Sequence, residues 1–110
     1  MLYFALNMFD FRDQEVYRKY LSVAGPIVEN ELGGKLICMG KITDKVPIQF
    51  ANTTIGGGQK WMIICQYLTE DGPKQLFDHP KYQAVKELRD LGTKNYVWAL
   101  YREANVLTEK

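Results

Sequence analysis

The sequence is short of the residues that metal, nucleic-acid and membrane functions require. It has one histidine, two cysteines and a formal net charge of only +1. One histidine and two widely separated thiols cannot supply the ligands of a usual zinc site. Charges of both signs are scattered, so the basic field that draws a protein to nucleic acid or to an anionic membrane is missing. We therefore expect no metal, no nucleic-acid partner and no membrane partner.

The cysteines and the first residues bear on the compartment. Cys38 and Cys65 each lie in an apolar run without a Cys-x-x-Cys spacing, which predicts two buried, reduced thiols. The stretch from Met1 to Leu6 is apolar but has no basic lead and soon meets Asp10, so it is too short for a signal peptide or a membrane span. These features predict a cytoplasmic protein.

Length and composition predict one domain over residues 1–110, with a core from about residue 2 to 103 and a short polar C-terminal tail. The 110 residues include 46% hydrophobic and 25% charged side chains. A chain of this size buries about two-thirds of its unfolded surface, which supports one thin layered core without a separate cofactor domain. We expect no cofactor, and a deep pocket can need a second subunit.

Four segments alternate with the period of two that is typical of strands: 2–9, 35–42, 59–68 and 95–102. A helix is predicted to start near residue 13, capped by Asp10 or Asp13, to kink at Pro26 and to end at Gly33-Gly34. The first three predicted elements along the chain are therefore a strand, a helix and a second strand.

The second half of the chain predicts two further helical segments. Thr69 can cap a short one, and Asp78 is expected to cap a second helix whose buried stripe includes Tyr82 and Leu91 and which stops at Gly92. The full order favours an α+β ferredoxin-like sandwich, a four-stranded antiparallel sheet with helices on one face.

The connection from Thr43 to Gly58 is long and holds a glycine triplet. It has room for a short edge strand at Ile48-Gln49-Phe50. The run Gly56-Gly57-Gly58-Gln59-Lys60 resembles a phosphate loop only superficially, because a strand follows it where a Walker loop needs a helix. A flexible turn is the preferred interpretation.

Neither face of the predicted strands is cleanly polar. Helices cover one face of such a sheet, and a wet second face would show a regular apolar and polar alternation. Residues such as Tyr3, Ile37, Met62 and Val97 break that alternation. The simplest way to bury this second face is an isologous homodimer, in which the sheet faces of two copies pack together. The alternative is an apolar face left exposed, which proteins tolerate while the patch stays small.

Five polar residues are candidates for a site. His79 is the acid/base candidate because histidine titrates near neutral pH, although it can equally be a surface residue of a helix start. Arg89 can bind a carboxylate or phosphate. Alternatively, it is a cation at the helix end that is stabilised by the helix dipole or paired with a surface acid. Asn7 and Gln66 interrupt apolar strands, where a buried amide needs partners, and Tyr82 belongs to the same helix as Arg89.

Several motifs resemble the family called domain of unknown function 1330, within the dimeric α/β-barrel superfamily. They are Tyr17-x-x-Tyr20, Pro26, Gly33-Gly34-Lys35, Gly40, His79-Pro80-Lys81-Tyr82-Gln83 and Arg89. The resemblance spans about Tyr3 to Tyr101 and implies a ferredoxin-like protomer whose homodimer forms a barrel. The connection from Thr43 to Gly58 and the pair Leu76-Phe77 depart from the family pattern, which suggests a divergent member.

Two functions remain open at this point. The first is an enzyme or binding protein for a small organic molecule, with His79 as the catalytic candidate and Asn7, Gln66, Tyr82 and Arg89 as ligand-binding candidates. The second is a non-catalytic homodimeric module with a structural or regulatory role. The wider superfamily includes cofactor-free and haem-dependent enzymes, so the fold does not choose between them. Haem would require His79 as its axial ligand.

Overall fold

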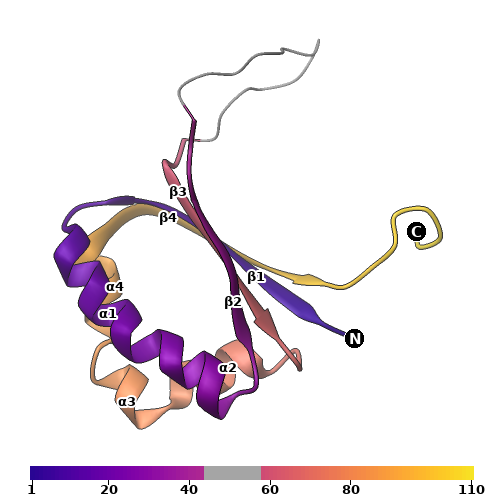
Figure 1. Ribbon diagram of the computed structural model, residues 1–110, viewed down its shortest axis with the longest axis horizontal. Coiled ribbons are helices and arrows are strands. Elements are labelled where there is room, and N and C mark those ends of the chain that lie inside the picture. Colours follow the sequence, from indigo (N-terminus) through magenta and orange to yellow (C-terminus); the bar gives the residue numbers. More distant parts are fainter. Residues whose placement is uncertain (44–57) are drawn as a thin grey trace.

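The computed structural model describes residues 1–43 and 58–110, and in it an antiparallel sheet carries all the described helices on one face (Figure 1). The strands are β1 (Tyr3–Phe11), β2 (Lys35–Lys41), β3 (Trp61–Tyr67) and β4 (Thr93–Arg102). They lie in the order β2-β3-β1-β4. The predicted four-stranded α+β architecture is confirmed, although the sheet of one chain stays open and does not close into a barrel. The edge strand expected at 48–50 lies outside the described residues.

The helical layer consists of one long element and several short ones. Their bounds are α1 (Gln14–Pro26), the π-helical turn η1 (Ile27–Glu31), α2 (Gly72–Asp78), α3 (Pro80–Gln83) and α4 (Lys86–Gly92). None of the helices in the described ranges is long and apolar enough to cross a membrane.

Helix α1 begins where the sequence predicts. Asp13 has extended backbone angles, and its Oδ1 accepts hydrogen bonds from the amides of Glu15 at 3.1 Å and Val16 at 3.2 Å. Those amides have no partner inside the helix, so the cap satisfies two donors that the first turn leaves open. Of the two capping candidates, the helix uses Asp13.

Removing this cap gives a first testable expectation. We expect Asp13→Ala to lower the free energy of unfolding by about 1 kcal/mol, because the two amides lose their acceptor. Asp13→Ser keeps a capping oxygen and should recover most of the loss. Urea denaturation followed by circular dichroism measures both, and equal stability of the alanine and serine variants would contradict the assignment.

Pro26 ends α1, and the chain continues as a π-helical turn. Proline has no amide hydrogen for a bond to the preceding turn, so the ladder must change there. The Leu32 amide bonds the Ile27 carbonyl at 3.1 Å, five residues back. Gly33 then adopts a left-handed backbone with φ 67°, and the Gly34 amide bonds the Val28 carbonyl at 2.8 Å. The predicted glycine stop is confirmed, and Gly34 is buried against the sheet.

The start of the second predicted helix is corrected by the structure. His79, not Asp78, caps α3: its backbone is extended and its Nδ1 accepts from the Lys81 amide at 3.1 Å. A residue that precedes proline is pushed out of the helical region, which places the cap at the residue before Pro80. Asp78 instead ends α2 and pairs with Lys74.

The single helix expected up to Gly92 is divided. A break at Ala84 and Val85 separates α3 from α4, and Leu91, expected in the buried stripe, is 62% exposed. The break changes which side chains of α4 face the sheet. Tyr82 is buried as expected, and Val85 and Leu88 pack on the core.

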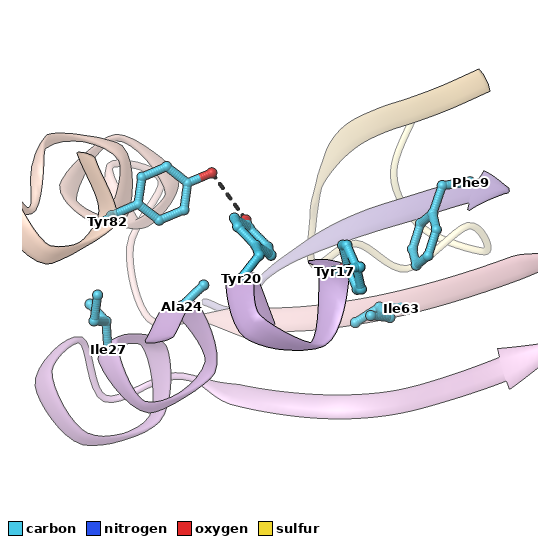
Figure 2. Packing of buried hydrophobic residues seen from close by; sticks show 7 residues of the cluster. All are labelled: Phe9, Tyr17, Tyr20, Ala24, Ile27, Ile63 and Tyr82. Atoms are coloured by element: carbon cyan, nitrogen blue, oxygen red, sulfur yellow. Dashed lines mark hydrogen bonds between the residues drawn. The ribbon is translucent and has the colours of Figure 1, made fainter. Parts of the chain in front are cut away.

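An aromatic core lies between the helices and the sheet, and Figure 2 shows its buried members. They are Phe9, Tyr17, Tyr20, Ala24, Ile27, Ile63 and Tyr82. Phe9 anchors the cluster, with its ring 4.9 Å from that of Tyr17 and 5.2 Å from that of Tyr96. Ring packing of this kind fixes the positions of the phenol groups on α1 and β4.

The side chains on the face of the sheet away from the helices, here called the open face, are mostly apolar, with Lys35 and Gln66 as a polar pair on β2 and β3. Register places on it Phe4, Leu6, Met8, Cys38, Met62, Ile64, Gln66, Val97, Ala99 and Tyr101. Cys38 is exposed there, which corrects the prediction of two buried thiols, since β2 is an edge strand with an irregularity between Leu36 and Cys38. Both cysteines are free.

Candidate functional site

A cavity of about 340 Å³ lies inside one chain, between the helical layer and the sheet. This volume is within the range of small-molecule sites. Its wall is rich in aromatic side chains: Tyr17, Tyr20, Tyr67, Phe77, Tyr82, Tyr96 and Trp98. Phe77 and Trp98 are about half exposed, at 51% and 45%, so the cavity reaches the surface beside α2 and beside β4.

Arg89 is the charged group of the cavity wall that lies farthest from solvent. It comes from α4, and its guanidinium carbon lies 3.8 Å from the centre of the Tyr96 ring, a close cation–π contact. Burial lowers the pKa of Arg89, but the nearby Tyr96, Tyr20 and Tyr82 side chains outweigh that effect and raise it. The guanidinium is therefore a permanent positive charge.

Two phenols from different helices meet at one side of the cavity. The hydroxyls of Tyr20, on α1, and Tyr82, on α3, are 3.0 Å apart and share a hydrogen bond (Figure 2). Burial raises the pKa of Tyr20 and of Tyr17 above the ordinary tyrosine value. Tyr17 and Tyr20 are thus neutral at physiological pH. Their hydroxyls can donate a hydrogen bond but cannot act as general bases in this state.

Asn7 orients a third phenol. Its Nδ2 donates to the Ile63 carbonyl at 3.2 Å and to the Ala5 carbonyl at 3.3 Å, and its Oδ1 accepts from the Tyr96 hydroxyl at 2.7 Å. Burial raises the pKa of Tyr96 to about 12. Both amide hydrogens of Asn7 have protein acceptors, and its oxygen holds the Tyr96 ring, which lies against Arg89.

The described part of the wall offers no conventional acid/base or nucleophilic pair. Among the described residues that line the cavity there is no aspartate, glutamate or histidine. Cys65 lies in the wall, but burial raises the pKa of its thiol to about 11, so it stays protonated and unreactive. In the ranges 1–43 and 58–110, no group of three or more His, Cys, Asp or Glu side chains is placed to hold a metal ion.

The structure brings together three of the five residues predicted from the sequence. Asn7, Tyr82 and Arg89 line the cavity. Gln66 lies on the open face opposite Phe4 and Lys35, because its neighbours Cys65 and Tyr67 point to the helical side. The amide therefore belongs to the other surface of the sheet.

His79 is also outside the cavity wall. Its Nδ1 caps α3, and its Nε2 lies 3.0 Å from Glu31 Oε1, in η1. Because Nδ1 accepts a hydrogen bond, the neutral ring carries its proton on Nε2 and donates it to Glu31. Both nitrogens are occupied, which fits a clamp between α3 and η1 and does not fit an axial ligand of haem.

Tyr17, Tyr20 and Tyr96 line the cavity but are not among the site residues predicted from the sequence, although Tyr17 and Tyr20 belong to the motifs of the family resemblance. Their period along α1 and β4 is that of ordinary core aromatics. The signal that could have found them is the hydroxyl group itself. A buried phenol needs a hydrogen-bond partner, and several on facing elements point to a shared polar site.

Known proteins match this chain in structure and not in sequence. Neither a protein-family model nor a curated protein matches the sequence. Solved structures do match over nearly the whole chain. A protein of unknown function from Rhodopseudomonas palustris is 18% identical, with a TM-score of 0.74 over 94% of this chain and 83% of its own. The fold is ferredoxin-like.

Two further ferredoxin-like structures illustrate the range of this similarity. A mutant form of SnoaB, a cofactor-independent oxygenase from Streptomyces nogalater, is 10% identical with a TM-score of 0.68 and 98% coverage of both chains. A dimeric ferredoxin-like protein of unknown function from Thermobifida fusca is 13% identical with a TM-score of 0.59, over 92% of this chain and 90% of its own. Structural similarity at such low sequence identity establishes the fold alone. Membership of the domain-of-unknown-function-1330 family stays a prediction.

Proposed function

We propose that this protein binds, or binds and transforms, a small organic molecule in the cavity between its helices and its sheet. The observation that carries the proposal is the cavity itself, a mostly apolar space of about 340 Å³ that is rich in aromatic side chains and is formed by one chain. Apolar walls with a few convergent polar groups are the usual design of small-molecule sites. Arg89 and the hydroxyls of Tyr20 and Tyr82 are those groups here.

The comparison with SnoaB supports this proposal without fixing the reaction. That protein is a cofactor-independent oxygenase with the same fold. The described wall of the present cavity has no carboxylate or imidazole to abstract a proton. Any transformation would therefore draw on the acidity of the bound molecule and on the positive charge of Arg89.

Filling the cavity tests the proposal. In Cys65→Phe the larger ring should occupy the space and abolish binding of 4-nitroanisole, a small neutral aromatic probe, whereas Cys65→Val should retain it. Binding is measured by nuclear magnetic resonance titration, in which shifts should concentrate at Tyr17, Tyr20 and Tyr82. Shifts confined to Leu6 and Ile64 would place the probe on the open face, and no saturable binding to the unmodified protein would overturn the proposal.

A second function, a homodimeric structural or regulatory module, is favoured by the open face. In one chain this face leaves Val97 41% and Tyr101 57% exposed, beside apolar side chains from β1 and β3. A contiguous apolar surface of this kind marks an interaction site. We propose a two-fold dimer in which the open faces of two copies pack together. It is compatible with ligand binding, since the cavity lies on the opposite side of the sheet.

A further inference from the structure

The charges around the cavity indicate what kind of molecule it accepts. Arg89 lies in the wall, and Lys74 is an exposed residue of the same lining that pairs with Asp78. No described acidic side chain lines the cavity. We propose that its ligand is an aromatic organic anion whose ionised oxygen is bound by the Arg89 guanidinium. This inference rests on the proposed function and specifies the ligand class of the same site.

The hydrogen bonding of Arg89 is incomplete without such a ligand. Its Nε is buried and has no hydrogen-bond partner in the described part of the chain, and no salt bridge with a described carboxylate neutralises the guanidinium. A buried donor left unpaired is unfavourable, and more so when it is charged. An anionic oxygen would neutralise this charge and accept a hydrogen bond from the guanidinium. Because Nε is shielded from solvent, the oxygen reaches the guanidinium at its terminal nitrogens or after a small turn of the side chain.

The phenols complete an anion site and not a cation site. The Tyr20 and Tyr82 hydroxyls share one hydrogen bond, which uses only one of their two protons. Among the described residues no acceptor takes the remaining hydroxyl proton, so a ligand oxygen can accept it. A cationic ligand could stack on the rings, but it would face Arg89 with no described carboxylate in the wall to balance the charge.

The aromatic side chains of the cavity wall indicate that the ligand carries an aromatic ring. Rings from the sheet, Tyr67 and Tyr96, and from the helices, Tyr17 and Phe77, line the space. Such walls pack a flat ring in offset or edge-on contact. A free inorganic anion would leave these apolar surfaces uncovered, so the charge must be carried on an apolar framework.

Two matched probes test the inference. The first is 4-nitrophenol, which absorbs visibly only when ionised, and the second is 4-nitroanisole, in which a methyl group blocks ionisation. At a pH above its own pKa, 4-nitrophenol should bind at least about tenfold more tightly than 4-nitroanisole, because hydrogen bonds to a charged group are among the strong ones. The positive charge should also lower the pKa of bound 4-nitrophenol by about one unit or more, so that its colour appears at lower pH.

Substitutions assign the effect to Arg89. In Arg89→Met the preference for 4-nitrophenol over 4-nitroanisole and the lowered pKa of bound 4-nitrophenol should both disappear, whereas Arg89→Lys should keep part of the preference. Arg18→Met removes an exposed arginine of α1 and should change neither value. If Arg89→Met does not fold, the pKa of 4-nitrophenol bound to the unmodified protein still decides.

The outcomes separate the two proposals. Equal affinity of the unmodified protein for the two probes, or an unchanged pKa of bound 4-nitrophenol, would overturn the anion assignment and leave the small-molecule site standing. An unaltered preference in Arg89→Met would also overturn it. Failure of both probes to bind the cavity would instead overturn the proposed function on which the inference rests.

Discussion

Leu6→Asp is expected to separate the proposed dimer into folded monomers. Leu6 lies at the centre of the open face, paired with Ile64 of β3 on one side and Ala99 of β4 on the other. A two-fold interface would contain the new carboxylate twice, and an unpaired charge taken out of water costs several kcal/mol. A cost of about 4 kcal/mol raises the dissociation constant about a thousandfold. Sedimentation equilibrium measures that change directly.

The same substitution elsewhere provides the control. Leu91 of α4 is 62% exposed and lies in the helical layer, so Leu91→Asp adds an equal charge without touching the open face. That variant should remain dimeric. Circular dichroism should show both variants folded, since in a single chain Leu6 already retains partial contact with solvent. A dimeric Leu6→Asp, or an unmodified protein that is monomeric at micromolar concentration, would refute the interface.

Gly34→Ala should be among the most destabilising single substitutions, with a loss of about 3 kcal/mol or more in the free energy of unfolding. A Cβ at Gly34 would lie 2.4 Å from the Gln66 carbonyl oxygen and 2.9 Å from Cγ1 of Val28. The carbonyl belongs to the backbone of β3 and cannot move away without shifting the strand. Urea denaturation gives the free energy.

Gly40→Ala is the matched comparison in the same region. Among the described residues, a Cβ there meets just the flexible end of Met62, with Sδ at 3.3 Å and Cγ at 3.4 Å. We expect a change of less than about 1 kcal/mol in either direction, because a partly exposed methionine side chain can turn aside. Similar losses at Gly34 and Gly40 would show that a general glycine effect, and not the backbone contact, determines stability.

Features that act within a few residues are the ones that the sequence predicts well. The alternation along β1 and β3, the aspartate at the start of α1 and the glycine pair after η1 are all local, and all four strands and the main helix follow from such signals. The apolar character of both sheet faces is also visible, because period two assigns every strand residue to one face or the other.

Contacts between distant segments are what the sequence does not specify. The Tyr20 and Tyr82 hydroxyls meet only because α1 and α3 pack side by side. Likewise, Asn7 and Tyr96 form a hydrogen bond only because β1 and β4 are adjacent in the sheet. His79 stands out in the sequence because histidine titrates near neutral pH. Its role as a helix cap and as the partner of Glu31 is determined by the following Pro80 and by a residue distant in sequence. The prediction of a buried Cys38 is wrong because an apolar run does not reveal that its strand is at the edge of the sheet.

The alternation along β1 also limits how this protein can change. Leu6 faces the open side and its neighbour Asn7 faces the cavity, so one strand separates the two surfaces with a single thickness of backbone. Inserting one residue before Leu6 would exchange the two sets of side chains if the strand kept its pairing. Substitutions can therefore alter either surface independently, but insertions and deletions in β1 would disrupt both together.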